Sequence, residues 1–90
     1  MTTPATFDAS RPYQLDPQVA LRPEPFGALA YHYGNRRLVF LRARELVELV
    51  EDLANHPTAE SALAARPEAR RRALYAALSS LEQSQVISAR

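Results

Sequence analysis

The fold is decided by the stretch Phe26-Gly-Ala-Leu-Ala-Tyr-His-Tyr-Gly-Asn-Arg-Arg-Leu-Val-Phe-Leu41. Two runs rich in aromatic and aliphatic residues flank the dipeptide Gly34-Asn35. A Gly-Asn pair between two such runs is typical of a β-hairpin closed by a two-residue primed turn. We therefore predict a hairpin whose strands cover residues 26–33 and 36–41.

A two-residue turn also fixes which residues lie opposite one another. The cross-strand pairs on one face are Tyr33 with Arg36, Tyr31 with Leu38, and Leu29 with Phe40. The other face carries Ala28, Ala30, His32, Arg37, Val39 and Leu41. Because the first face is large and aromatic, we expect it to pack against the rest of the domain.

The chain before the hairpin is rich in proline, at positions 4, 12, 17, 23 and 25. Each proline fixes its own φ and lacks a backbone donor, so no helix runs through this region. Between two of these prolines, the alternation in Gln18–Arg22 predicts a further strand. Residues 1–11 have little to bury, and we expect a flexible segment there and a single domain over residues 12–90.

After the hairpin the apolar period changes from 2 to about 3.6. A first helix over about residues 43–55 is indicated by Leu46, Leu49, Val50 and Leu53. Thr58 is a good N-cap for a short second helix, and Pro67-Glu68 is a favourable start for a third. That third helix carries Leu74, Leu78 and Leu81. Three strands followed by three helices predict an α+β domain with a three-stranded antiparallel sheet and a winged-helix-like arrangement, and residues 85–87 add a brief extended piece.

Composition excludes several classes of function. The formal net charge of +1, from 11 basic and 10 acidic residues, gives no strong field toward nucleic acid or an anionic membrane. The absence of cysteine excludes a disulfide framework, thiolate metal or cluster ligands and a cysteine nucleophile. Residues 1–10 do not resemble a signal peptide, and no apolar run approaches the ~20 residues of a membrane span. We therefore expect a cytoplasmic protein.

No set of residues indicates catalysis. His32 and His56 lack a second ligand at metal-binding spacing, and His56 is better interpreted as a cap of the first helix. The carboxylates of that helix alternate with its apolar stripe, as on a solvated face. The chain has only two glycines and no phosphate-binding loop. We expect no enzymatic activity, no cofactor and no metal.

Two features stand out. If residues 36–41 form the edge of the sheet, an extended peptide could add to them as a further strand; an ordinary edge blunted by Arg36 and Arg37 is the alternative. The second feature is the run Arg70–Arg72, with Arg66 nearby. Recognition of DNA by a winged helix, capture of an acidic partner, and a solvated helix face all remain open for it, although +1 is a weak charge for a DNA-binding protein.

A resemblance narrows these alternatives. The run Leu15-Asp-Pro-Gln-Val-Ala-Leu-Arg-Pro-Glu-Pro, continuing through the hairpin to Leu41, and then Arg44-Glu-Leu46, resembles the peptide chaperones of mycofactocin maturation. These belong to the broader class of peptide-recognition elements of ribosomally made peptides, which includes the chaperone of pyrroloquinoline quinone biosynthesis. The resemblance covers the chain from Arg11 onward; it is specific across Pro23–Leu41 and looser in the helices.

The resemblance implies a non-catalytic adaptor. A ribosomally made precursor peptide would dock as an added strand against the third strand, and the third helix would form the other wall. A radical-SAM enzyme would be the second partner and would carry out the oxidative decarboxylation and crosslinking with its own iron–sulfur clusters. Neither nucleic acid nor a membrane is implied as a partner; a winged-helix DNA-binding protein is the rival interpretation.

The expected peptide-binding residues follow from the resemblance and from geometry. On the strand, the resemblance points to Arg36, Arg37, Leu38, Val39, Phe40 and Leu41. On the helix wall, our geometric inference selects Arg71, Leu74, Tyr75 and Leu78. Arg36, Arg37 and Arg71 could attract acidic residues of the precursor.

Overall fold

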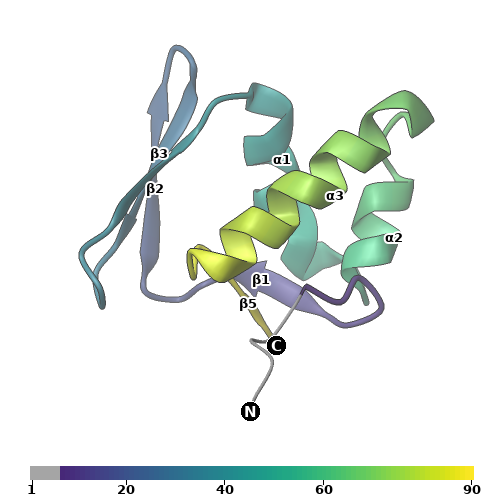
Figure 1. Cartoon of the computed structure of the whole chain (residues 1–90), viewed down its shortest axis with the longest axis horizontal. Helices are drawn as coiled ribbons and strands as arrows, with labels where there is room; N and C mark the ends of the chain where they lie inside the picture. Colours follow the sequence, from purple (N-terminus) through teal and green to yellow (C-terminus); the bar gives the residue numbers. More distant parts are fainter. Residues whose placement is uncertain (1–6) are drawn as a thin grey trace.

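Two small sheets and three helices make up residues 7–90, the part of the chain that the computed structural model describes (Figure 1). The strands are β1 (Tyr13–Leu15), β2 (Val19–Glu24), β3 (Gly27–His32), β4 (Leu38–Leu41) and β5 (Ile87–Ala89). The helices are α1 (Arg44–Asp52), the 3-10 turn η1 (Leu53–Asn55), α2 (Ala59–Ala64) and α3 (Glu68–Gln83). The predicted α+β class is confirmed.

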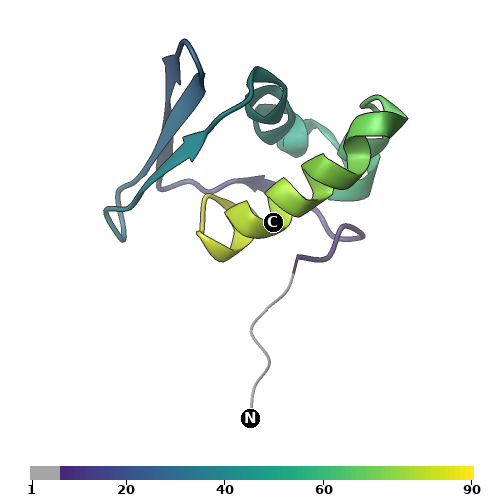
Figure 2. The same ribbon diagram turned by 45° about the horizontal axis from the view of Figure 1, so that its top comes forward.

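The larger sheet is antiparallel, with the strand order β2-β3-β4. Its β3–β4 register places Tyr31 opposite Leu38 and Leu29 opposite Phe40, which confirms the predicted pairing. In Figures 1 and 2 this sheet lies at one side of the molecule, and the three helices lie together at the other side of the molecule.

The turn between β3 and β4 is not the predicted two-residue turn. The His32 carbonyl accepts from the Arg36 amide (2.7 Å), and the His32 amide donates to the Arg37 carbonyl (3.0 Å), so the loop has four residues. Arg36, rather than Gly34 or Asn35, has the positive φ, of 62°. The cause is the His32 ring, whose Nδ1 accepts from the amides of Gly34 (3.0 Å) and Asn35 (3.1 Å). Because two residues are added symmetrically, the strand register is the same.

The prediction of which hairpin face packs inward was wrong. Ala28, Ala30 and Leu41 are buried, whereas the aromatic side of the hairpin is exposed to solvent. Small side chains let α1 approach β3 closely, and the bulk of the core comes from helical leucines instead. At Gly27, with φ of 147°, a Cβ would meet the backbone of Leu41 and Ala43, so this crossing needs glycine.

A second sheet ties the two ends of the domain together. β1 pairs antiparallel with β5, with Tyr13 opposite Ala89 and Leu15 opposite Ile87. β1 was not predicted from the sequence, and the last extended piece, predicted over residues 85–87, lies two residues later. The chain enters β5 because α3 ends in a Schellman motif: Gln85 has φ of 66°, and Val86 donates to the Leu81 carbonyl (2.9 Å).

Part of the segment that we expected to be flexible is packed. Phe7 is buried, with its ring 4.9 Å from that of Tyr13. The carbonyls of Ala9 and Arg11 accept from the amides of Glu60 (2.8 Å) and Ala59 (3.0 Å), which lie at the start of α2 and have no partner within that helix. Residues 1–6, the other half of that segment, lie outside the described residues.

The helices begin where the sequence predicts. Thr58 Oγ1 accepts from the Ser61 amide (3.1 Å), which confirms the N-cap, and α3 starts directly after Pro67. The central core contains Leu41, Leu49, Val50, Leu53, Leu74, Leu78, Leu81 and Ile87. Among the described residues, no helix has the length and apolar character that crossing a membrane requires.

Candidate functional site

β4 lies at an edge of the three-stranded sheet, with one side paired to β3. The His32 amide donates to the Arg37 carbonyl (3.0 Å), and hydrogen-bonded positions alternate with non-bonded ones along an antiparallel ladder. Val39 and Leu41 therefore turn their backbone groups toward β3. The N–H and C=O groups of Leu38 and Phe40 point away from the sheet, where a further strand could pair with them.

The opposite edge of the sheet is different. By the same alternation, starting from the Tyr33–Gln18 hydrogen bond (2.7 Å), β2 turns the backbone of Val19, Leu21 and Pro23 outward. A proline on an outward position offers no donor, and this blunts the edge against strand pairing. β4 has no proline, so it is the edge of this sheet that can accept another strand.

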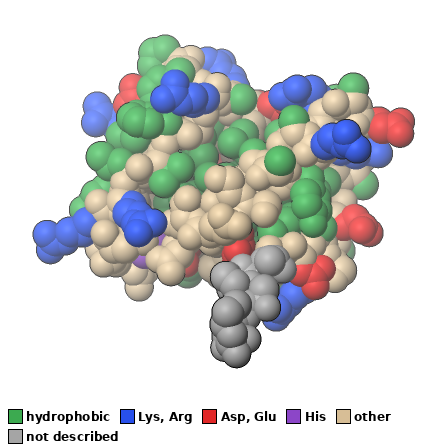
Figure 3. Space-filling view, in the orientation of Figure 1, with side chains coloured by type: hydrophobic (Ala, Val, Ile, Leu, Met, Phe, Trp, Pro, Cys, Tyr) green, Lys and Arg blue, Asp and Glu red, His purple; other side chains and the backbone are tan. Residues whose placement is uncertain are grey.

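Helix α3 is linked to the β4 region at two points. Arg70 Nε donates to Glu45 Oε1 (2.9 Å), in the first turn of α1 just beyond β4. Asn35 Nδ2, in the β3–β4 loop, donates to Gln85 Oε1 (2.9 Å), just beyond α3. These two contacts bound the space between β4 and α3, and Figure 3 shows hydrophobic side chains gathered there and over the sheet.

The structure separates the four residues that we expected on the helix wall. Leu74 and Leu78 are buried in the core. Arg71 donates to the carbonyls of Arg66 (3.0 Å) and Ala64 (2.9 Å), at the end of α2. Tyr75 is 43% exposed, and its ring meets that of Phe7 edge-on at 5.1 Å. Arg71 and Tyr75 thus line a shallow apolar hollow beside α2, together with Ala9, Leu63 and Ala64.

A different flank of α3 is turned toward the first turn of α1, which follows β4 in the chain. Arg70 marks this flank through its contact with Glu45. Ala73 and Ala77 follow it at the spacing of three and four residues that places side chains on one helix face. These residues were not among those predicted, because large anchoring side chains were expected on the helix wall. The two alanines that share a helix face with Arg70 were the available signal.

The charged residues of the β3–β4 loop are available for a partner. Arg36 and Arg37 are exposed. The ion pairs within residues 7–90 involve Arg22, Arg66, Arg70 and the two histidines, but neither of these loop arginines. Their positive charges lie at the loop end of β4.

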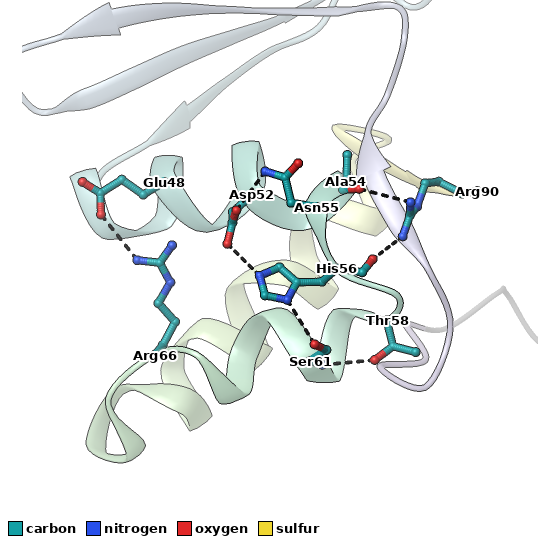
Figure 4. Close-up of polar contacts among 9 residues, drawn as sticks. All are labelled: Glu48, Asp52, Ala54, Asn55, His56, Thr58, Ser61, Arg66 and Arg90. Carbon is teal, nitrogen blue, oxygen red and sulfur yellow. Dashed lines mark hydrogen bonds and ion pairs between the residues drawn. The ribbon is translucent and has the colours of Figure 1, made fainter.

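A polar chain links Asp52, His56 and Ser61 between α1 and α2 (Figure 4). His56 Nε2 lies 2.8 Å from Asp52 Oδ2, and His56 Nδ1 lies 3.0 Å from Ser61 Oγ. The order of groups resembles an acid–base–nucleophile series. Here, however, the members also stabilise helix ends. Asp52 accepts a hydrogen bond from Asn55 Nδ2 (3.0 Å) at the end of α1, and the Ser61 amide donates to the N-cap Thr58 at the start of α2.

Neighbouring contacts support a structural role for the polar series Asp52–His56–Ser61. The guanidinium of Arg90 donates to the carbonyls of Ala54 and His56, which fastens the end of the chain to the same turn. The hydrogen bond from Asn55, and then the one from His56, hold the pKa of Asp52 below its usual range. Within residues 7–90, no cluster of His, Cys, Asp and Glu could hold a metal ion.

The fold and the site define a class: a small α+β domain with an unblunted strand edge beside a helix. Comparison with known proteins identifies the group within that class. The chain belongs to the peptide chaperone MftB family, whose model matches residues 12–88. The resemblance to mycofactocin peptide chaperones is thereby confirmed.

Curated relatives agree with this assignment. The chain is 58% identical over 60 residues to the peptide chaperone MftB of Mycolicibacterium smegmatis, an alignment that covers 67% of this chain and 59% of the relative. It is 54% identical over 56 residues to the peptide chaperone MftB of Mycobacterium tuberculosis, covering 62% of this chain and 51% of the relative. The chain thus spans little more than half the length of these relatives. No solved structure matches.

Proposed function

We propose that this chain is a non-catalytic peptide chaperone that binds a ribosomally made precursor by strand addition to β4 and presents it to a radical-SAM maturation enzyme of mycofactocin biosynthesis. The observation that carries the proposal is the edge of β4, which offers the backbone groups of Leu38 and Phe40 in a member of a peptide chaperone family. An extended peptide gains affinity from such main-chain hydrogen bonds and selectivity from its side chains.

The flank of α3 turned toward β4 suits an added strand. Residues of the peptide would alternate in direction, with one set facing α3 and the other facing the outer side of the sheet. Ala73 and Ala77 would leave space for the inward set, and Leu74 and Leu78 would support that wall from the core. Arg71 and Tyr75 would contact a peptide only where it continues toward α2.

Charge would help to select the precursor. Arg36 and Arg37 lie at the loop end of β4 without an ion pair in the described part of the chain. Acidic residues on the corresponding end of the precursor would be attracted to them, which raises the rate of association more than the final affinity.

Presentation would work through effective concentration. A chaperone that binds both the precursor and the enzyme makes the second contact intramolecular, and this raises the local concentration of substrate without a new chemical step. The oxidative chemistry would reside in the enzyme, because a chain without cysteine has no thiolates with which to hold an iron–sulfur cluster.

The structure gives little support to the rival interpretation, which is DNA binding through Arg70–Arg72. Arg70 is paired with Glu45, and Arg71 donates to backbone carbonyls at the end of α2. Of the three arginines, Arg72 remains to contact phosphates, which is a small electrostatic footprint for a DNA-reading helix.

The proposal is tested by proline substitution at the outward-facing position of β4. Phe40→Pro removes an edge donor but spares the ladder to β3, so the fold is retained and affinity for the synthetic precursor falls about tenfold or more. Phe40→Ala is the matched control, since it shortens the side chain and keeps the donor. Calorimetric titration of both variants, with a scrambled peptide alongside, makes the comparison. Equal affinities of folded Phe40→Pro and wild-type protein would remove strand addition at β4.

A further inference from the structure

The outer face of the three-stranded sheet is apolar, and no helix or strand of residues 7–90 covers it. In both ribbon views the helices lie on the opposite side of this sheet. Of the five large hydrophobic side chains that are exposed within residues 7–90, four gather here: Phe26 (42%), Tyr33 (63%), Leu38 (56%) and Phe40 (54%). With the half-buried Leu29 and Tyr31 they form what we call the aromatic face, which consists of Phe26, Leu29, Tyr31, Tyr33, Leu38 and Phe40. A contiguous exposed patch of this kind marks an interaction site in a soluble domain.

The aromatic face is ordered by contacts among its own side chains. The rings of Phe26 and Phe40 meet edge-on at 5.7 Å, and those of Tyr31 and Tyr33 at 4.9 Å. The guanidinium of Arg42 lies 5.4 Å from the centre of the Phe40 ring. Pre-ordered aromatic side chains with an adjacent arginine are the composition of binding hot spots, because little side-chain entropy remains to be lost.

The charges around the aromatic face select the kind of partner. Arg22 lies opposite Leu29 on this face, and Arg42 lies over Phe40. Glu24, the carboxylate of the outward side of β2, is already paired with Arg22 at 3.1 Å. Because Arg22 shares its charge with Glu24, Arg42 leaves the rim with a net positive charge. A second copy of the chain would bring the same positive rim against itself, whereas a different protein with carboxylates around an apolar surface would complement it.

We propose that the aromatic face binds the maturation enzyme, an inference that rests on the proposed function. The enzyme would offer an apolar surface bordered by Asp and Glu side chains. A peptide strand added to β4 continues the same sheet, so its outward side chains lie beside those of Leu38 and Phe40. The enzyme therefore contacts the chaperone and the precursor on one continuous surface. The precursor uses the backbone edge of β4, and the enzyme uses the outward side chains, so the two partners do not compete.

The test uses two variants outside β4. Phe26→Ser combined with Tyr33→Ser removes two rings from the aromatic face, and Arg22→Glu combined with Arg42→Glu reverses its rim charge. Arg72→Glu, an exposed reversal on α3 away from the sheet, is the matched control for charge. For each protein, biolayer interferometry measures the Kd for the purified maturation enzyme of the same mycofactocin gene cluster, and calorimetry measures the Kd for the precursor.

We expect both double variants to weaken enzyme binding about tenfold or more, while the Kd for the precursor and the circular dichroism spectrum stay unchanged. The Arg72→Glu control should bind the enzyme as the wild type does. Full enzyme affinity in both double variants would overturn this inference and leave the proposed chaperone function intact. A wild-type dimer by sedimentation that the ring variant converts to a monomer would also overturn it. No binding of the wild-type chain to the enzyme would instead overturn the presentation step itself.

Discussion

At the scale of single residues, His32 shows how one side chain can replace a standard turn. Among residues 7–90, His32 is the polar residue that is buried in the core. Its Nδ1 accepts hydrogen bonds from two amides of the β3–β4 loop. Asn35 Oδ1 accepts from the Arg37 amide (2.9 Å) and completes the loop. The Gly-Asn pair predicted a hairpin and its register, but the turn type depended on a ring two residues earlier, which turn statistics do not include.

Asp52 gives a prediction about pH. Its pKa is lowered in the folded protein by the hydrogen bonds from Asn55 and His56. A carboxyl group whose pKa is lower in the folded protein stabilises the fold at pH values above its unfolded pKa of about 3.9. That stabilisation is lost as the pH falls through the folded pKa. Asp52→Asn should therefore unfold at a lower temperature than the wild type near neutral pH, and the gap should close as the pH falls below about 4.

Thermal unfolding followed by circular dichroism between pH 7 and pH 3 checks this expectation. Glu51→Gln is the control, because it removes a neighbouring exposed carboxylate of α1 that lies outside the polar chain. A constant gap between Asp52→Asn and wild type at every pH would show that the carboxylate carries no stabilising hydrogen bonds.

At the scale of secondary structure, the sequence predicted the elements better than their orientation. The helix starts at Thr58 and Pro67 follow local rules of capping, so they could be predicted from a few neighbouring residues. Which face of the hairpin packs inward depends on how closely α1 approaches β3, and this is a property of the whole core. The alanines at positions 28 and 30 fit that close approach, and the larger side chains are left outside.

The same distinction applies to the candidate site. The edge position of β4 followed from strand order, and the resemblance pointed to it. The flank of α3 nearest to β4 could not be read from periodicity alone, because Arg70 and Arg71 lie about 100° apart, on the two flanks of the buried stripe, and the pattern does not say which flank meets the sheet. Only their partners, Glu45 and the carbonyl of Ala64, show that they turn to opposite sides.

The small side chains of this flank lead to a prediction at the element scale. Ala73→Leu should narrow the space between α3 and β4 and weaken precursor binding about tenfold, since overfilling a fitted space costs roughly 1–3 kcal/mol. Both residue types favour helix, so the stability of α3 should change little.

Calorimetric titration compares this variant with Ala76→Leu, an exposed alanine on the outward side of the same helix. The control should bind the precursor with wild-type affinity. If Ala73→Leu and Ala76→Leu bind equally well, the flank marked by Arg70 does not face the bound peptide.

At the scale of the whole molecule, the two sheets have different roles. The β1–β5 sheet and the Arg90 contacts close the chain on itself. Within the described part of the chain, the three-stranded sheet is open on one edge and one face, which are the two places where we propose that the precursor and the enzyme bind. A 90-residue chain has little room for an enclosed cavity, and edges and faces are what a domain of this size can offer.

The central claim is that the precursor adds to β4 as a strand, and amide hydrogen exchange tests it most directly. Residue-resolved exchange, measured with and without a saturating amount of synthetic precursor, reports which backbone amides gain a partner. We predict that the amides of Leu38 and Phe40 become strongly protected, whereas those of Val39 and Leu41, already bonded to β3, change less. Binding without added protection at Leu38 and Phe40, or with protection confined to the hollow beside Tyr75, would contradict the account.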